Sequence, residues 1–198
     1  MEITAALVKQ LRDLTGTGMM ECKAALQEAG GNIDEAVTIL RKRGLAQASK
    51  KSGRSTGEGL IGSYIHAGGK IGVLVELNCE SDFVARTEDF QTLLKEIALQ
   101  VAAANPTYVR REDVPADVLE RERAIYRGQM ESSGKPAPVI EKIIEGKLGS
   151  FYEQNVLVDQ ASIRDPKTTV SQLIKAAIAK LGENIAVARF VRFRVGGE

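Results

Sequence analysis

The sequence predicts an α+β fold: a small three-helix domain, then an antiparallel sheet of about three strands packed with helices. Apolar residues recur at helical spacing in residues 1–44 and again in several stretches between 90 and 181. Residues 71–79 and 185–195 instead alternate inward-facing apolar side chains with other residues, as strands with one buried face do. The last strand must therefore return to the sheet from far along the chain, which favours α+β.

Composition narrows the classes of function. The chain has 198 residues, and its 27 Lys and Arg against 26 Asp and Glu leave a net charge of +1, which lacks the basic excess of a duplex nucleic-acid binder. Cys22 and Cys79 stand far apart and His66 is the single histidine, so neither a zinc site nor a disulfide framework is expected. We predict no metal and no cofactor. No apolar stretch approaches membrane length, and we expect a cytoplasmic protein that does not bind membranes.

Residues 1–44 are predicted to fold as the N-terminal helical domain. Thr4 can cap the first helix, Met19 lies in the second, and Asn32 with Glu35 makes a capping-box-like start for the third. Glycines separate the three helices, and Gly44 is expected to end the last. Three short helices close only a small core, which is typical of a module that binds a partner. The apolar stripes are Leu7, Leu11 and Leu14; Met19, Cys22, Leu26 and Ala29; and Ile33, Ala36, Val37 and Leu40.

Residues 45–57 are polar, small and basic, which indicates a linker or an exposed helix extension. The rest of the chain, 58–198, is the predicted α+β core domain. It begins with a hairpin that turns at Ala67-Gly68-Gly69. In the second strand, one face is predicted to be buried, with Ile71, Val73, Val75, Leu77 and Cys79.

Helical sequence fills the middle of the core domain. A strong stripe runs from Phe90 to Val101, whereas the charged helix 116–130 has only a weak apolar face. With another helix starting near Val139, it is predicted to form a projecting helical hairpin. A final helix, 170–181, precedes the last strand. That strand should place Arg192 and Arg194 on one face and five apolar residues on the other: Ile185, Val187, Val191, Phe193 and Val195.

The connection from Ser81 to Arg86 joins the second strand to the Phe90 helix and is the candidate functional segment. Phe83 and Val84 are apolar in an otherwise polar connection. An aromatic side chain on an anchored corner is a typical interface anchor, and its burial in a partner contributes roughly 1.5–3 kcal/mol. The alternative is structural: Phe83 tucks under its own domain, and Ser81 or Asp82 merely caps a helix.

Two other classes of function are weighed. Three short helices can imitate a helix-turn-helix, so a nucleic-acid-binding helical-domain protein is the alternative, although the first two helices hold few basic residues. A hydrolase with a Ser/His pair would depend on His66, and the sequence has no Gly-x-Ser-x-Gly. No catalytic residue is assigned, and the protein is not predicted to be an enzyme.

Four segments form recognisable motifs, and two of them, residues 11–26 and 78–86, are long and specific. They are Leu11-Arg12-Asp13-Leu14-Thr15-Gly16-Thr17-Gly18-Met19-Met20-Glu21-Cys22-Lys23-Ala24-Ala25-Leu26; Ser63-Tyr64-Ile65-His66 with Ile71-Gly72-Val73-Leu74-Val75-Glu76; Asn78 to Arg86; and Gly182-Glu183-Asn184-Ile185 with a strand ending in Arg192-Phe193. In this order they resemble the elongation factor Ts family over essentially the whole chain. Only one set of core motifs is present, as in the short bacterial forms.

This resemblance implies a function in translation elongation. Members similar to this chain are guanine nucleotide exchange factors that bind elongation factor Tu, GDP-bound or nucleotide-free. Their N-terminal domain, similar to ubiquitin-associated domains, docks on the nucleotide-binding domain of that GTPase. The corner formed by Asp82 and Phe83, framed by Ser81 and Val84, would wedge near the magnesium site, so that Mg²⁺ and GDP leave and GTP can bind. No bond is made or broken in such exchange.

The resemblance also implies further contacts and an assembly. The additional partner contacts would be Arg12, Met19, Met20, Lys51, His66 and Ile185. Short forms similar to this chain pair as homodimers, so a homodimer is expected. Ser81 stands where the family usually has Thr, which keeps the hydroxyl. Val191 lies where a short relative has a cysteine that can bridge the dimer, so the covalent link would be absent here.

Overall fold

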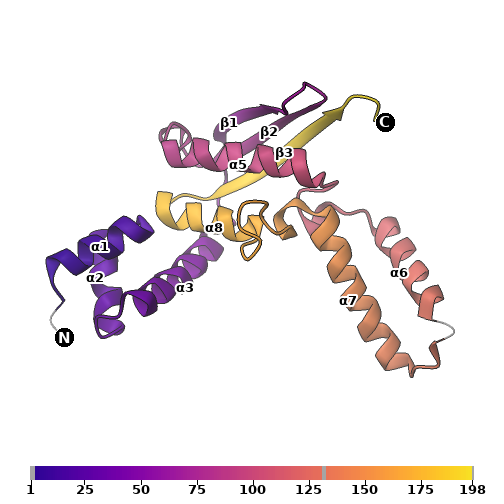
Figure 1. Cartoon of the computed structure of the whole chain (residues 1–198), viewed down its shortest axis with the longest axis horizontal. Coiled ribbons are helices and arrows are strands. Elements are labelled where there is room, and N and C mark those ends of the chain that lie inside the picture. Colours follow the sequence, from indigo (N-terminus) through magenta and orange to yellow (C-terminus); the bar gives the residue numbers. More distant parts are fainter. Residues whose placement is uncertain (1–2, 131–132, 198) are drawn as a thin grey trace. The chain divides into compact units, whose positions relative to one another are not determined.

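The computed structural model describes residues 3–130 and 133–197, and it confirms the α+β class (Figure 1). The three strands form one antiparallel sheet in the order β1-β2-β3. The elements are α1 (Ala5–Thr15), α2 (Met19–Glu28), α3 (Ile33–Lys51), β1 (Glu58–Ile65), β2 (Ile71–Cys79), α4 (Asp82–Ala85), α5 (Glu88–Ala104), η1 (Arg111–Asp113), α6 (Ala116–Met130), α7 (Ala137–Asn155), η3 (Leu157–Asp159), α8 (Val170–Leu181) and β3 (Ile185–Arg194).

Two compact units make up the structure. The first holds α1, α2, α3, α4 and the turn between α8 and β3. The second holds the β1–β2 turn, most of α5 and the pair α6 and α7. Among the residues that the structure describes, none of the helices combines the length and the apolar character needed to cross a membrane.

The first three helices begin where the sequence predicts them. Thr4 caps α1 by accepting a hydrogen bond from Leu7 N at 3.3 Å, and Asn32 caps α3 by accepting from Glu35 N at 3.1 Å. Gly16 ends α1 in the left-handed conformation, with φ of 66°, which glycine adopts without strain. Buried side chains of all three helices share one core: Val8, Leu11, Cys22, Ala25, Leu26, Ala29, Ala36 and Leu40.

The expectation that Gly44 ends the third helix is wrong. Helix α3 continues through Gly44 to Lys51, so residues 45–51 are the helix extension that was one of two alternatives. A Cβ atom on Gly44 would lie 2.9 Å from the Cβ of Ala179 in α8. The glycine is therefore a point of close helix approach, where a larger side chain has no room.

The β-hairpin forms as predicted, and its buried face is confirmed except at Ile71, which is only half-buried. Along β2, Val73, Val75, Leu77 and Cys79 are buried, and the residues between them are not. On β1, a Cβ atom at Gly62 would lie 2.6 Å from Cγ of Leu94. This glycine therefore lets β1 lie directly on α5.

The last strand differs from its prediction in its second half. Ile185 and Val187 are buried, but Val191, Phe193 and Val195 are exposed. Arg192 lies on the helix-facing side instead, where its Nε donates to the carbonyl of Ala102 at 3.2 Å. The predicted single buried face is therefore wrong for the last three apolar residues.

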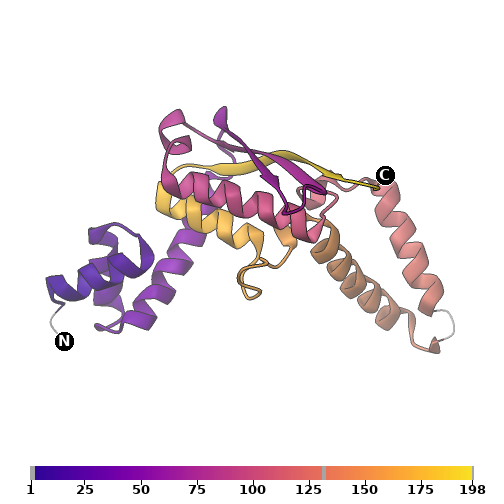
Figure 2. The same cartoon turned by 45° about the horizontal axis from the view of Figure 1, so that its top comes forward.

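Helices α6 and α7 run side by side in both views (Figures 1 and 2), which confirms the helical hairpin. Ion pairs join their exposed faces, among them Arg127 with Glu141 at 2.8 Å. In α7 only Ile144 and Leu148 are buried, and α6 has no buried residue. The weak apolar face of the sequence thus corresponds to a thin hydrophobic contact.

Candidate partner-binding site

The Ser81 corner (residues 81–86) turns the chain from the end of β2 into α5. Ser81 is extended, with φ of −133°, and its Oγ accepts a hydrogen bond from Val84 N at 3.5 Å. The four-residue helix α4 then places Val84 and Ala85 in the interior. Thr87 starts the next helix, because its Oγ1 accepts from Phe90 N at 3.3 Å. The corner is thus attached to the core at both ends.

Phe83 stands at the tip of this corner with 78% of its surface exposed. Asp82 beside it pairs with Arg86 at 2.6 Å, and both side chains are partly in solvent. The structural alternative is therefore right for Ser81, which does cap a helix, and wrong for Phe83, which does not tuck under its own domain. Isolated exposed apolar residues are common on proteins, but this one lies on a fixed turn.

Glu183 holds the corner from the turn between α8 and β3. Its Oε2 accepts from the backbone N–H of Glu80 at 3.1 Å and of Ser81 at 2.9 Å. Its Oε1 accepts from Ser81 Oγ at 2.6 Å. The sequence predicted no role for Glu183, although the residue belongs to the Gly182-Glu183-Asn184-Ile185 motif.

The same turn is tied to the segment that follows α3. Lys51 Nζ donates to the carbonyl of Gly182 at 2.7 Å, and Asn184 Nδ2 donates to the carbonyl of Arg54 at 2.8 Å. Asn184 N also donates to Glu80 Oε1 at 2.6 Å. Lys51, predicted as a partner contact, thus holds its own chain together through its ammonium group.

Cys79 lies beneath the corner and is a packed thiol. Its Sγ donates to the carbonyl of Ser81 at 3.1 Å. Burial raises the pKa of the Cys79 thiol above its ordinary value, and the negative charge of Glu183 raises it further. The thiolate is the reactive form of cysteine, so this pKa disfavours a nucleophilic role. Within residues 3–130 and 133–197, no cluster of three or more His, Cys, Asp and Glu side chains is placed to hold a metal ion.

The comparison with known proteins decides the family. The model of the family described as "Elongation factor TS" matches residues 2–197. Elongation factor Ts of Thermosipho melanesiensis is 61% identical over 194 residues, which cover 98% of this chain and 99% of that protein. Elongation factor Ts of Fervidobacterium nodosum is 60% identical over 196 residues, covering 99% of this chain and all of that protein. Elongation factor Ts of Solibacter usitatus is 57% identical over 195 residues, which cover 98% of this chain and 92% of that protein.

The chain belongs to the elongation factor Ts family. Its role is accordingly that of a translation elongation factor. The Ser81 corner and the turn with Glu183 both lie in the motifs that carry the resemblance to this family.

The remaining residues that the elongation factor Ts resemblance singled out occupy different environments. Arg12 is exposed on α1, and Met20 on α2 has 78% of its surface exposed, against 42% for Met19. His66 is exposed in the second unit, and its Nδ1 lies 3.0 Å from the hydroxyl of Tyr64. The side chain of Ile185 is buried, at 2% exposed. Their contact roles stay predictions.

Proposed function

We propose that this protein is a guanine nucleotide exchange factor that binds elongation factor Tu in its GDP-bound form. It promotes the release of Mg²⁺ and GDP, so that GTP can bind. Membership of the elongation factor Ts family supports this proposal. The observation that carries it is the exposed Phe83 at the tip of a corner that is hydrogen-bonded to its own core.

A wedge must be apolar at its tip and rigid at its base. Phe83 supplies apolar surface whose burial in the GTPase stabilises the complex by roughly 1.5–3 kcal/mol. Asp82 places a carboxylate beside it, close to where the GTPase holds its cation. The base is rigid because Ser81 is fixed by Glu183 and Val84 is buried. The site comprises Ser81, Asp82, Phe83 and Val84.

Exchange of this kind is a coupling between two ligands of one GTPase. If the exchange factor lowers the affinity for GDP by a given factor, GDP lowers the affinity for the exchange factor by the same factor. No acid, base or nucleophile is required, so the protein acts by binding and is not an enzyme that makes or breaks bonds. It needs no cofactor and no nucleic acid of its own, and we place it in the cytoplasm with the translation machinery.

The N-terminal domain is proposed to dock the protein on the GTPase. We assign residues 1–44 to this ubiquitin-associated-like domain, 45–57 to the linker and 58–198 to the core. Met19 and Met20 offer flexible, polarizable side chains that suit a contact surface, and Arg12 lies on the neighbouring helix. Such docking would bring the corner to its target at high effective concentration.

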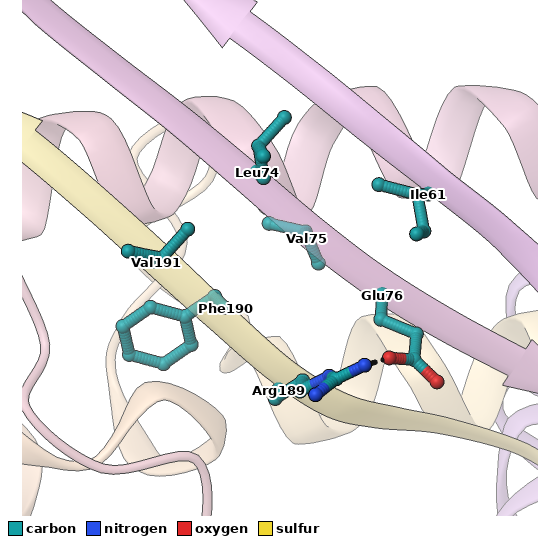
Figure 3. Close-up of a pocket in the computed structure, with 7 residues that line it drawn as sticks. All are labelled: Ile61, Leu74, Val75, Glu76, Arg189, Phe190 and Val191. Atoms are coloured by element: carbon teal, nitrogen blue, oxygen red, sulfur yellow. Dashed lines mark hydrogen bonds and ion pairs between the residues drawn. The ribbon is translucent and has the colours of Figure 1, made fainter.

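The protein is further proposed to form a homodimer through the open face of its sheet. Three exposed apolar side chains, one from each strand, lie on this face: Ile61, Leu74 and Val191 (Figure 3). They line a pocket of about 280 Å³ whose edge carries the ion pair of Arg189 with Glu76. Exposed apolar patches of this kind mark association surfaces, and a second copy would cover this one.

The exchange function is tested by stopped-flow release of a fluorescent GDP analogue from elongation factor Tu, with and without this protein. We expect the protein to accelerate release strongly, and Phe83→Ala to lose most of the acceleration while folding normally. Ile163→Ala is the matched control, since Ile163 is also a large apolar residue with an exposed side chain but lies outside the corner. Release at the wild-type rate with Phe83→Ala would refute the wedge.

A further inference from the structure

We propose that Glu183 is the positioning residue of the corner: its carboxylate sets the direction in which Asp82 and Phe83 project. This inference rests on the proposed exchange function and deepens it. Glu183 contacts neither tip side chain by hydrogen bond; its acceptor bonds go to Glu80 and Ser81, directly before the tip.

Local structure alone holds the tip weakly. Helix α4 is four residues long, and a helix of one turn is unstable by itself because its nucleation is unfavourable. The side-chain cap of α4, which Val84 N donates to Ser81 Oγ, is long at 3.5 Å. Phe83 is mostly in solvent, so packing does not orient it. The buried Val84 and Ala85 hold the chain after the tip, so the direction in which the tip leaves the sheet depends on the backbone at Ser81.

The Glu183 carboxylate fixes that backbone by three hydrogen bonds. Two of these bonds are donated by the backbone N–H groups of Glu80 and Ser81, so they set the orientation of both peptide planes. The third is donated by the Ser81 hydroxyl. Hydrogen bonds to an ionised carboxylate are roughly twice as strong as those between neutral groups. Among the hydrogen bonds of the described residues, neither Glu80 N nor Ser81 N donates to a backbone carbonyl that could replace Glu183.

Glu183 is itself held in place by its neighbours. Gly182 accepts from Lys51 Nζ, and Asn184, 5% exposed, donates to the carbonyls of Ser52 and Arg54. The clamp on the corner is thus anchored to the end of α3. A site works when the residues that support it are themselves fixed, and the turn from Gly182 to Asn184 supplies that second support.

A loosened corner should reduce the rate of exchange more than the binding of the GTPase. Docking surfaces elsewhere on the chain would still form the complex, but the tip would sample directions that do not displace the target. A preorganised corner avoids the free-energy cost of ordering the tip when the complex forms. We therefore expect the maximal rate of GDP release to fall when Glu183 is truncated, with little change in the half-saturating concentration.

The test compares Glu183→Ala with Glu183→Gln in the stopped-flow assay. The glutamine keeps a carbonyl oxygen for the two N–H groups, and its amide can donate to Ser81 Oγ. We expect Glu183→Ala to lower the maximal rate about tenfold, with the half-saturating concentration within about threefold, because small misplacement of a working group is costly. Glu183→Gln should stay within about threefold of wild type in both. Asp89→Asn is the control, since Asp89 is an acidic residue of the same unit that pairs with Lys180.

Amide hydrogen exchange in the free protein gives a second readout that does not depend on the GTPase. Glu183→Ala should make the Glu80 and Ser81 amides exchange about tenfold faster or more, and Asp89→Asn should not. Should Glu183→Ala fail to fold, Ser81→Ala carries the test through amide exchange of the free protein. It removes one of the three bonds, so the Glu80 amide should exchange faster than in wild type, and unchanged exchange would overturn the positioning role.

The outcomes separate the two proposals. Unchanged amide exchange in Glu183→Ala overturns the positioning role, and so does a wild-type maximal rate despite faster amides. In both cases the exchange function stands if wild type accelerates GDP release and Phe83→Ala does not. A wild-type protein that leaves GDP release unaccelerated overturns the exchange function and the positioning role together.

Discussion

Ser81 and Glu183 are 102 residues apart in the sequence and share a hydrogen bond of 2.6 Å between Oγ and Oε1. This bond links the end of β2 to the start of β3, since Ser81 follows β2 and Glu183 precedes β3. It joins the residue that starts the exposed tip to the turn that is bound to the end of α3. The stability of the corner therefore depends on contacts between residues that are far apart in the sequence.

Removing the Ser81 hydroxyl should destabilise the protein modestly. Ser81→Ala leaves Glu183 with two amide donors but without its hydroxyl donor, so we expect a loss of about 1–2 kcal/mol in the free energy of unfolding. Ser81→Thr keeps the hydroxyl and should lie near wild type. Urea unfolding followed by circular dichroism measures both. Equal stability of Ser81→Ala and wild type would show that the bond contributes nothing.

Truncating Phe83 should leave stability unchanged, in contrast to its effect on exchange. The side chain is 78% exposed, and surface substitutions usually change stability by less than about 0.5 kcal/mol. We therefore expect Phe83→Ala to unfold at the wild-type urea concentration. A clearly lower midpoint would mean that Phe83 packs against its own chain, and any loss of exchange would then have a structural cause.

Adding a methyl group at Gly44 should destabilise α3 against α8. The new Cβ would lie 2.9 Å from that of Ala179, and overpacking of this kind costs about 1–3 kcal/mol, more than alanine gains over glycine in a helix. Gly146→Ala in α7 is the matched control, because nothing lies within 4 Å of its Cβ position. That variant should be stabilised by up to about 1 kcal/mol, and urea unfolding would show opposite signs for the two.

The Cys79 thiol should make the protein less stable at alkaline pH. Its pKa in the folded state is raised above the ordinary 9.0, so the folded state keeps the proton that the unfolded state loses. The contribution of this group is fully present below pH 9.0 and is lost as the pH rises through the folded pKa.

Comparing Cys79→Ala with wild type isolates this contribution. Between about pH 7.5 and about pH 10.5, wild type should lose more unfolding free energy than the variant, measured by urea unfolding with a reducing agent present. Cys79→Ala will be less stable than wild type at both pH values because it leaves a cavity. The deciding quantity is therefore the change in unfolding free energy between the two pH values, compared between the variant and wild type. Equal slopes would contradict the prediction.

A charge on the open face of the sheet should separate the proposed dimer. Leu74 is about half exposed, so Leu74→Asp leaves the folded chain nearly unaffected but buries an unpaired carboxylate in the interface, which is costly. Light scattering should give the mass of two chains for wild type and of one for the variant. Ile163→Asp, on an exposed loop position, should remain dimeric. A wild-type mass of one chain would refute the dimer.

The sequence by itself determined the elements and the tip of the site. The helices of residues 1–44, the β-hairpin and the helical hairpin follow from local periodicity and capping, which depend on residues a few positions apart. Phe83 was a candidate because it is an aromatic residue in a polar connection, and the motif around it gave the family.

Only the tertiary structure decided which residues far apart in the sequence contact one another. Gly44 is a contact point with Ala179, Lys51 is bound to Gly182, and Glu183 holds Ser81. It also decided that Phe83 is exposed while Val191 and Phe193 lie on the open part of the sheet. No periodic pattern encodes such pairings, because burial and hydrogen bonding depend on which elements pack together, and alternation along a strand does not say which face another element covers.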